Sequence, residues 1–223
     1  MKNYSVFDIL GPIMIGPSSS HTAGAARLAK VASVIAGKNI VSVQFMLHGS
    51  FAKTYKGHGT DKALVAGILG MDPWDESLKD SLGIAKEQGL IIKFIPVDLG
   101  DVHPNTVKFI ITKKSGKVVE IMGSSVGGGN ILIFEVDGQA IDFTGNYPTI
   151  IISHQDVPGM ISKVSTLLYN EDINVATMNV YRNSRGLKAA MVFETDTIVP
   201  KDVLNKIKTI GNIYNIKEIT PVL

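Results

Sequence analysis

The chain of 223 residues is 45% hydrophobic and 19% charged, so it can bury a real core, and its length favours two modest domains. Its 22 basic and 20 acidic residues are spread along the chain and leave a net charge of +2, which argues against nucleic acid or an anionic membrane as partner. No apolar run approaches the roughly 20 residues of a spanning helix, and the opening residues are not a signal peptide, so we expect a cytoplasmic protein.

The sequence contains no cysteine. This excludes disulfides, thiolate catalysis and cysteine ligation of zinc or an iron–sulfur cluster by this chain. None of the five histidines is paired at the i, i+4 spacing of a helical metal site, so we predict no metal site built by this chain alone. Chemistry of that kind has to come from a partner.

The predicted elements of the first part of the chain indicate an α+β domain. Helices are expected where small and aliphatic residues recur with helical spacing, and strands where apolar runs lie between Gly-, Pro- or Asn-bearing turns. Thr60 is the expected N-cap of its helix. The elements in chain order are helix 18–35, strand 40–47, helix 61–69, helix 74–88, and strands 90–97, 106–112, 117–122 and 131–136.

The turn residues Gly145-Asn146-Tyr147-Pro148 predict a domain boundary, which gives domains at 1–146 and 147–223. The elements expected after the boundary are strand 149–153, helix 159–170, strand 173–181, strand 187–195, helix 201–209 and strand 212–220. This order is a complete ferredoxin-like βαββαβ unit.

The pattern of this unit resembles the ACT domain, a regulatory module that binds amino acids. The resemblance rests on Asp156-Val157-Pro158-Gly159 before the first helix and on Asn174-Val175-Ala176-Thr177-Met178 in the second strand. We expect Asp156, Pro158 and Gly159 to form an effector-binding or dimer-contact region, because Gly159 allows close backbone approach and the helix start offers free N–H groups. A capped helix start without a ligand is the alternative.

A first polar cluster, Gly16-Pro17-Ser18-Ser19-Ser20-His21-Thr22-Ala23-Gly24, lies at a predicted helix start. Backbone N–H groups there favour a carboxylate or a phosphate, and the serine hydroxyls add donors. The alternative is a well-capped helix whose small residues permit close packing.

A second cluster is Leu47-His48-Gly49-Ser50-Phe51-Ala52, followed by Gly57-His58-Gly59-Thr60-Asp61. His58, flanked by glycines before a helix, can approach a ligand closely, and the positive helix end disfavours the imidazolium, so His58 is our best candidate for a base. A glycine-rich turn that contains an exposed histidine is the alternative. His48, inside a predicted strand, is interpreted as a satisfied core or interface histidine.

A third cluster, His103-Pro104-Asn105-Thr106, lies on a loop that leads into a strand. Asn105 and Thr106 can hold a substrate carboxylate or hydroxyl and His103 can shuttle a proton, although a plain turn is equally compatible. Gly127-Gly128-Gly129 lacks the Gly-Lys-Ser/Thr ending of a phosphate loop and predicts a hairpin turn or bulge. We expect the three polar clusters to converge at one edge of the first domain.

Together these motifs closely resemble the β chain of bacterial two-subunit L-serine dehydratases over nearly the whole chain. The residues that carry the resemblance are Ser5-Val6-Phe7-Asp8-Ile9-Leu10-Gly11-Pro12, which runs into Gly16 to Thr22, then Gly57 to Asp61 and His103 to Thr106. The resemblance implies a cysteine-bearing α chain that holds a [4Fe-4S] cluster, no cofactor on this chain, and a first domain similar to the allosteric substrate-binding domain of some 3-phosphoglycerate dehydrogenases. Related single-chain enzymes carry both halves, so this chain is expected to be inactive alone.

The implied reaction is loss of water from L-serine to give aminoacrylate, which hydrolyses to pyruvate and ammonia. A cluster iron would act as Lewis acid on the leaving hydroxyl while a histidine removes the Cα proton. We expect His58 and His103 to be catalytic and the ACT-like domain to form a homodimer. The residues expected to bind substrate are Ser18, Ser19, Ser20, His21, Thr60 and Asn105.

Two other functional classes remain open at this point. The first is a non-catalytic regulatory or scaffolding subunit that senses an amino acid through its ACT-like domain. The second and weaker one is a pyridoxal-phosphate dehydratase, because nothing in the sequence singles out a Schiff-base lysine.

Overall fold

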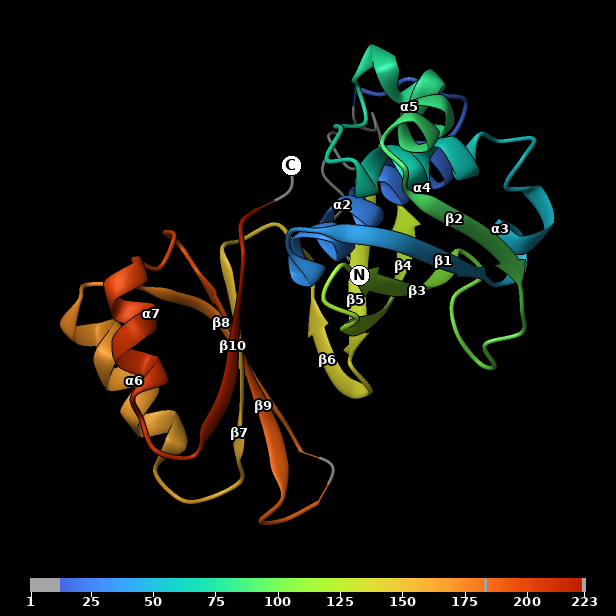
Figure 1. Ribbon diagram of the computed structural model, residues 1–223. Helices are drawn as coiled ribbons and strands as arrows, with labels where there is room; N and C mark the ends of the chain where they lie inside the picture. Colours follow the sequence, from blue (N-terminus) through green and yellow to red (C-terminus); the bar gives the residue numbers. More distant parts are fainter. Residues whose placement is uncertain (1–12, 183, 222–223) are drawn as a thin grey trace, which may run out of the picture. The chain divides into compact units, whose positions relative to one another are not determined.

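The computed structural model describes residues 13–182 and 184–221, and the chain separates into two compact units, 1–133 and 134–223 (Figure 1). The stretch Ser5 to Pro12, part of the predicted resemblance, lies outside the described residues. Within the described ranges, no helix combines the length and the apolar character needed to cross a membrane.

The first unit combines helices with a mixed sheet. Its helical segments are η1 (Ser19–Gly24), α2 (Ala25–Ala36), α3 (Gly49–Thr54), α4 (Thr60–Ile68), η2 (Glu76–Asp80) and α5 (Ser81–Glu87). The strands β1 (Ile40–Leu47), β2 (Ile91–Pro96), β3 (Thr106–Lys113), β4 (Val118–Gly127), β5 (Asn130–Val136) and β6 (Gln139–Phe143) form a sheet in the order β2-β1-β3-β4-β5-β6. Strand β1 pairs parallel with β2 and antiparallel with β3. The division between the two units falls within β5, so β6 belongs to the second unit although it is the last strand in this sheet order.

One face of this sheet forms the core of the first unit, because apolar side chains alternate along its strands. Val43, Phe45 and Leu47 of β1 are all at most 1% exposed. They lie opposite Ile111, Phe109 and Val107 of β3, which are fully buried as well. Helix α2 covers this face closely: a Cβ added at Gly123 of β4 would meet Leu28 of α2 at 2.8 Å.

Helices α2 and α4 pack against each other through small residues. A Cβ at Gly67 of α4 would lie 2.1 Å from the carbonyl oxygen of Ala26 and 2.7 Å from Cβ of Ala29. The absence of a side chain at Gly67 therefore sets the distance between the two helices.

The second unit contains the predicted βαββαβ order. Its elements are β7 (Thr149–Gln155), α6 (Met160–Asn170), β8 (Val175–Arg182), β9 (Lys188–Thr195), α7 (Lys201–Lys208) and β10 (Ile213–Ile219). The strands form a sheet in the order β10-β7-β9-β8, with every neighbouring pair antiparallel. Both helices lie on one face of it (Figure 1). Buried residues of β7 and β9 form the core with residues of α6 and α7, among them Ile152, Phe193, Val164 and Val203.

Several predicted helix starts need correction. The helix expected at 18–35 opens with the six-residue π-helix η1 before α2 begins. The expected N-cap Thr60 is the first residue inside α4, and Gly59, with a left-handed φ of 69°, precedes it as the cap. The helix expected at 74–88 is divided into η2, which Asp75 caps by accepting a 2.9 Å hydrogen bond from the Ser77 N–H, and α5, which begins at Ser81.

Two short elements, α3 and β6, were not predicted, because runs of five or six residues carry too little periodicity. The hairpin expected at 127–129 is confirmed: β4 ends at Gly127 and β5 starts at Asn130. The predicted division at 146/147 lies between β6 and β7 and stays a prediction.

We expect Gly67→Ala to destabilise the first unit by about 1–3 kcal/mol, because the added methyl group collides with the backbone of α2. Urea unfolding followed by the fluorescence of Trp74, the single tryptophan, measures this loss. The matched control is Gly83→Ala in α5, where nothing lies within 4 Å of the new Cβ. The control should be neutral or stabilise by up to about 1 kcal/mol, and equal destabilisation by both variants would refute the packing argument.

Candidate functional site

The histidine of the first polar cluster is held by serine hydroxyls on both sides of its ring. Ser18 caps η1, and its Oγ accepts a 3.2 Å hydrogen bond from the His21 N–H. The same oxygen lies 3.4 Å from Nδ1 of His21, and the ring's Nε2 lies 3.1 Å from Oγ of Ser50. Two serines from different elements therefore orient the half-buried ring.

His58 meets this ring from the turn before α4. The two imidazoles lie edge to face with centroids 4.8 Å apart. His58 is exposed, and Gly59 beside it takes a left-handed backbone conformation with nothing within 4 Å of its missing Cβ. The pair therefore combines an oriented, half-buried histidine with an exposed one on an open turn.

Burial and charge keep the inner histidine neutral. Desolvation lowers the pKa of His21, and the positive charge of a protonated His58 lowers it further. Because the folded state binds this proton less tightly, the neutral ring contributes stability above its ordinary pKa of about 6.5, and that contribution is lost as the pH falls. His21 can therefore accept or relay a proton at neutral pH.

The third cluster is tied to the start of α3 through its backbone. The Pro104 carbonyl accepts a 2.8 Å hydrogen bond from the Ser50 N–H, and a Cβ at Gly49 would come 2.7 Å from that oxygen. The exposed His103 accepts a 3.1 Å bond at Nδ1 from the Asn105 N–H. Among the described contacts, none joins the His103 ring to His21 or His58, so the loop approaches the site while this side chain faces solvent.

His48 was predicted inside a strand, and this is wrong. It follows the last residue of β1 and precedes α3 as its N-cap. Its Nδ1 accepts a 3.1 Å hydrogen bond from the Leu99 N–H, and Asp98 Oδ1 lies 3.6 Å away. Through these contacts at Nδ1, His48 joins the start of α3 to the loop that contains Asp98 and Leu99.

The remaining residues expected to bind substrate differ in accessibility. Ser19 and Ser20 are half-buried on η1, and Asn105 is half-buried with its carbonyl accepting from the Ser125 N–H at 3.0 Å. Thr60 is 0% exposed. Because Thr60 is also absent from the lining of the cavity beside His58, we leave it out of the substrate contacts proposed below.

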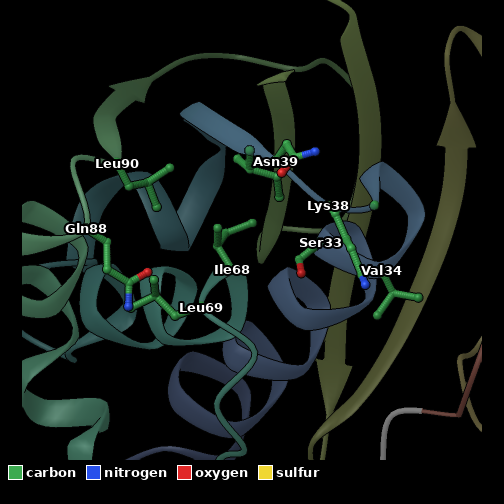
Figure 2. A pocket seen from close by; sticks show the side chains of 10 residues that line it. Ser33, Val34, Lys38, Asn39, Ile68, Leu69, Gln88 and Leu90 are labelled. Carbon is green, nitrogen blue, oxygen red and sulfur yellow. The ribbon is translucent and has the colours of Figure 1, made fainter. Parts of the chain in front are cut away.

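Two cavities lie at opposite ends of the first unit. One, of about 330 Å³, adjoins His58 and includes Gly16, Thr22 and Lys62. The other, of about 400 Å³, includes Lys38, Asn39, Leu69 and Gln88 where α2 and α4 end and β1 begins, as Figure 2 shows. The eight residues of β1 separate the second cavity from the histidine end by roughly 23 Å, so only the first belongs to the site.

The predicted effector loop of the second unit is tied to a neighbouring hairpin. Oδ2 of Asp156 accepts hydrogen bonds from the Gly186 N–H at 3.0 Å and from Arg182 at 3.2 Å, and these groups lower the pKa of the carboxyl. Pro158 and Gly159 are exposed at the start of α6, and Gly159 has a left-handed φ of 86°. Asp156 thus shapes the loop, whereas the two exposed residues remain available for contact.

The sequence analysis placed Ser50 in the second cluster without giving it a role, and it missed the lysines near His58 as site residues. Ser50 lies in an unpredicted helix, and exposed lysines are common, so neither has a distinctive local pattern. Over residues 13–182 and 184–221, no group of three or more His, Asp or Glu side chains is arranged to hold a metal ion.

The fold and the site together define a protein in which an α+β unit that carries a histidine–serine site is joined to a ferredoxin-like unit. Residues 5–89 match the family described as serine dehydratase beta chain, and residues 148–212 match the ACT domain. The chain belongs to the family of L-serine dehydratase β chains. The resemblance and the fold class predicted from the sequence are thereby confirmed.

Three relatives illustrate the match. The L-serine dehydratase beta chain of Peptoniphilus asaccharolyticus is 46% identical over 197 residues, which cover 88% of this chain and 89% of the relative. The "Probable L-serine dehydratase, beta chain" of Bacillus subtilis is 43% identical over 219 residues, or 98% and 99% of the two chains. A D-3-phosphoglycerate dehydrogenase of Bacillus subtilis is 26% identical over 199 residues, which cover 86% of this chain but 37% of that enzyme.

We expect His21 to titrate below 6.5 in the full chain, and we expect His58→Asn to raise its pKa without restoring the ordinary value, because burial is the larger cause. Proton–carbon NMR of the histidine rings across a pH series measures both shifts. His103→Asn is the control and should leave His21 unchanged. A His21 pKa that does not respond to His58→Asn would show that the two rings are not electrostatically coupled.

Proposed function

We propose that this chain is the β subunit of an L-serine dehydratase, which converts L-serine to pyruvate and ammonia together with a cysteine-bearing α subunit. The observation that carries the proposal is the contact of His21 with His58 at 4.8 Å, with Ser50 on the inner ring, inside the segment that matches the family. Elimination of water from serine requires a group that removes the weakly acidic Cα proton, and a histidine is suited to this at neutral pH.

The residues of this chain do not fit an iron–sulfur cluster, because it offers no thiolate ligand. We assign the [4Fe-4S] cluster to the α subunit, where it would supply a Lewis acid for the leaving hydroxyl. The tasks proposed for this chain are binding of the amino acid and movement of one proton.

His58 is proposed as the base that accepts the Cα proton. Its ring is exposed, and the adjoining Gly57 and Gly59 leave the backbone open to close approach. His21, oriented by Ser18 and Ser50, is proposed to position His58 and to bind substrate.

The other polar residues are proposed to surround the substrate. Ser19 and Ser20 contribute hydroxyls from η1. Asn105 and His103 orient the substrate from the loop that Pro104 ties to α3. Because His103 is exposed and apart from the histidine pair in the described contacts, its role is secondary to that of His58.

The ACT unit is proposed to bind an amino acid effector or to form a dimer contact through Pro158 and Gly159. Helix α6 begins without a side-chain cap and without an acidic residue in its first turn, so its N–H groups can donate hydrogen bonds to a carboxylate. Asp156 is proposed to hold the loop in shape through Gly186 and Arg182.

We expect the chain purified alone under anaerobic conditions to contain no iron or acid-labile sulfide and to release no pyruvate from L-serine, because it has no thiolate. Anaerobic co-expression with a cysteine-rich α chain should yield a complex that contains both and produces pyruvate. The α chain alone is the control. Turnover by the single chain, or a pyridoxal absorbance band in the active complex, would contradict the proposed division of labour.

We expect His58→Ala to lower the turnover number of the assembled enzyme by about 10²–10⁴-fold, the loss typical of a general base. Subunit assembly and iron content should stay normal, since the ring is exposed. Lys86→Ala on α5, also exposed, is the control. A normal turnover number at saturating serine would indicate that residues 57–59 form only a structural turn. It would then favour the alternative function, a non-catalytic subunit that senses an amino acid.

A further inference from the structure

The cavity beside His58 is positively charged. Its charged lining side chains are the ammonium groups of Lys56, Lys62 and Lys79, and no carboxylate is among its lining residues. Within the described part of the chain none of the three lysines forms an ion pair; the contact found for Lys56 is with the ring of Tyr55 at 5.8 Å. Three adjacent cations without an acidic neighbour in the cavity favour an anion there.

The wall of the same cavity contains a buried polar group without a partner. Thr22 is 1% exposed, and its Oγ1 has no hydrogen-bond partner among the described residues. A Cβ at Gly16 would lie 2.3 Å from this oxygen, so the Gly16 backbone packs directly against the Thr22 side chain and any side chain at position 16 would displace it. Buried hydroxyls are almost always hydrogen-bonded, and a ligand oxygen in the cavity would supply the missing partner.

The backbone donors nearby are already used, which restricts how an anion is held. The Thr60 N–H donates to the Tyr55 carbonyl at 2.9 Å, and the Thr22 N–H donates to the Ser18 carbonyl at 2.8 Å. The start of α4 therefore contributes little to binding. The lysine side chains and the Thr22 hydroxyl remain as the groups able to bind an anion.

We infer that this cavity is the subsite for the α-carboxylate of the amino acid substrate, bound by Lys62 and Lys56 and by the Thr22 hydroxyl. The inference rests on the proposed function and adds a specificity rule to it. In an α-amino acid the carboxylate is bonded directly to Cα, so binding it in a cavity lined by His58 brings the Cα proton to that ring. The volume of about 330 Å³ is large enough for a small amino acid.

The subsite therefore selects substrates with a free carboxylate. L-serine and the unreactive L-alanine should bind through it, whereas L-serinamide and L-alaninamide should not, because the lysines then face an uncharged group. The rival explanation is that the lysines dock an acidic segment of the α chain. Such a surface would not distinguish a free amino acid from its amide.

The kinetic test uses the assembled enzyme with Lys62→Met, Lys56→Met and Thr22→Val. We expect Lys62→Met and Lys56→Met each to raise KM for L-serine at least tenfold while kcat changes less than threefold, and Thr22→Val to raise KM about threefold or more. Lys86→Met, exposed on α5 and outside the cavity, is the control. Unchanged KM in both lysine variants overturns the inference, as does weaker α-chain binding with KM intact, which would identify a docking surface.

A binding test separates this inference from the proposed activity. Saturation-transfer NMR on the full chain, with L-alanine and L-alaninamide as probes, should show contact with L-alanine that Lys62→Met reduces at least fivefold, and no such difference for the amide. If the assembled enzyme makes no pyruvate but L-alanine binds in this way, the proposed function fails and the carboxylate subsite stands. Equal signals from acid and amide in the wild-type chain overturn the subsite even when the enzyme is active.

Discussion

The first unit depends on the close packing of α2 against α4. Gly67 lies so near Ala26 that any side chain there would collide with the α2 backbone. The two helices run in the same direction, since both end at the cavity of Figure 2 while the residues that precede them meet at the histidine pair. This packing is why His21, before α2, and His58, before α4, become neighbours.

Small polar residues are buried in and next to the segments that carry the histidine pair, where a core optimised for stability would be apolar. Thr22, Thr60 and Ser125 each bury a hydroxyl without a partner among the described residues. Gly24 of the π-helix faces Ser125 so closely that a Cβ would approach its Oγ to 2.0 Å. Single π-helical turns and unsatisfied buried polar groups are concentrated at functional sites, where ligand binding compensates for their cost.

The core of the second unit differs from that of the first in its composition. Its core is almost wholly aliphatic and aromatic, and its sheet and two helices follow the regular ferredoxin-like arrangement. The loop before α6 is held by polar contacts, because Asp156 binds both Arg182 and Gly186. A regular apolar core with one specifically tied loop suits a module whose ligand contacts can vary while its fold does not.

The sequence by itself determined the order of the main elements, the ACT-like unit, the family and the absence of thiolate chemistry in this chain. These features follow from local periodicity, from turn residues and from motifs that are continuous in the chain. Only the tertiary structure decided which polar residues meet. Ser50 reaches His21 across 29 positions and lysines from three segments gather at one cavity, while His103 stays apart from the pair. The reason is that side-chain contacts of this kind depend on how helices pack and where loops are tied. The close approach of α2 and α4 at Gly67, for example, has no local signal in the sequence.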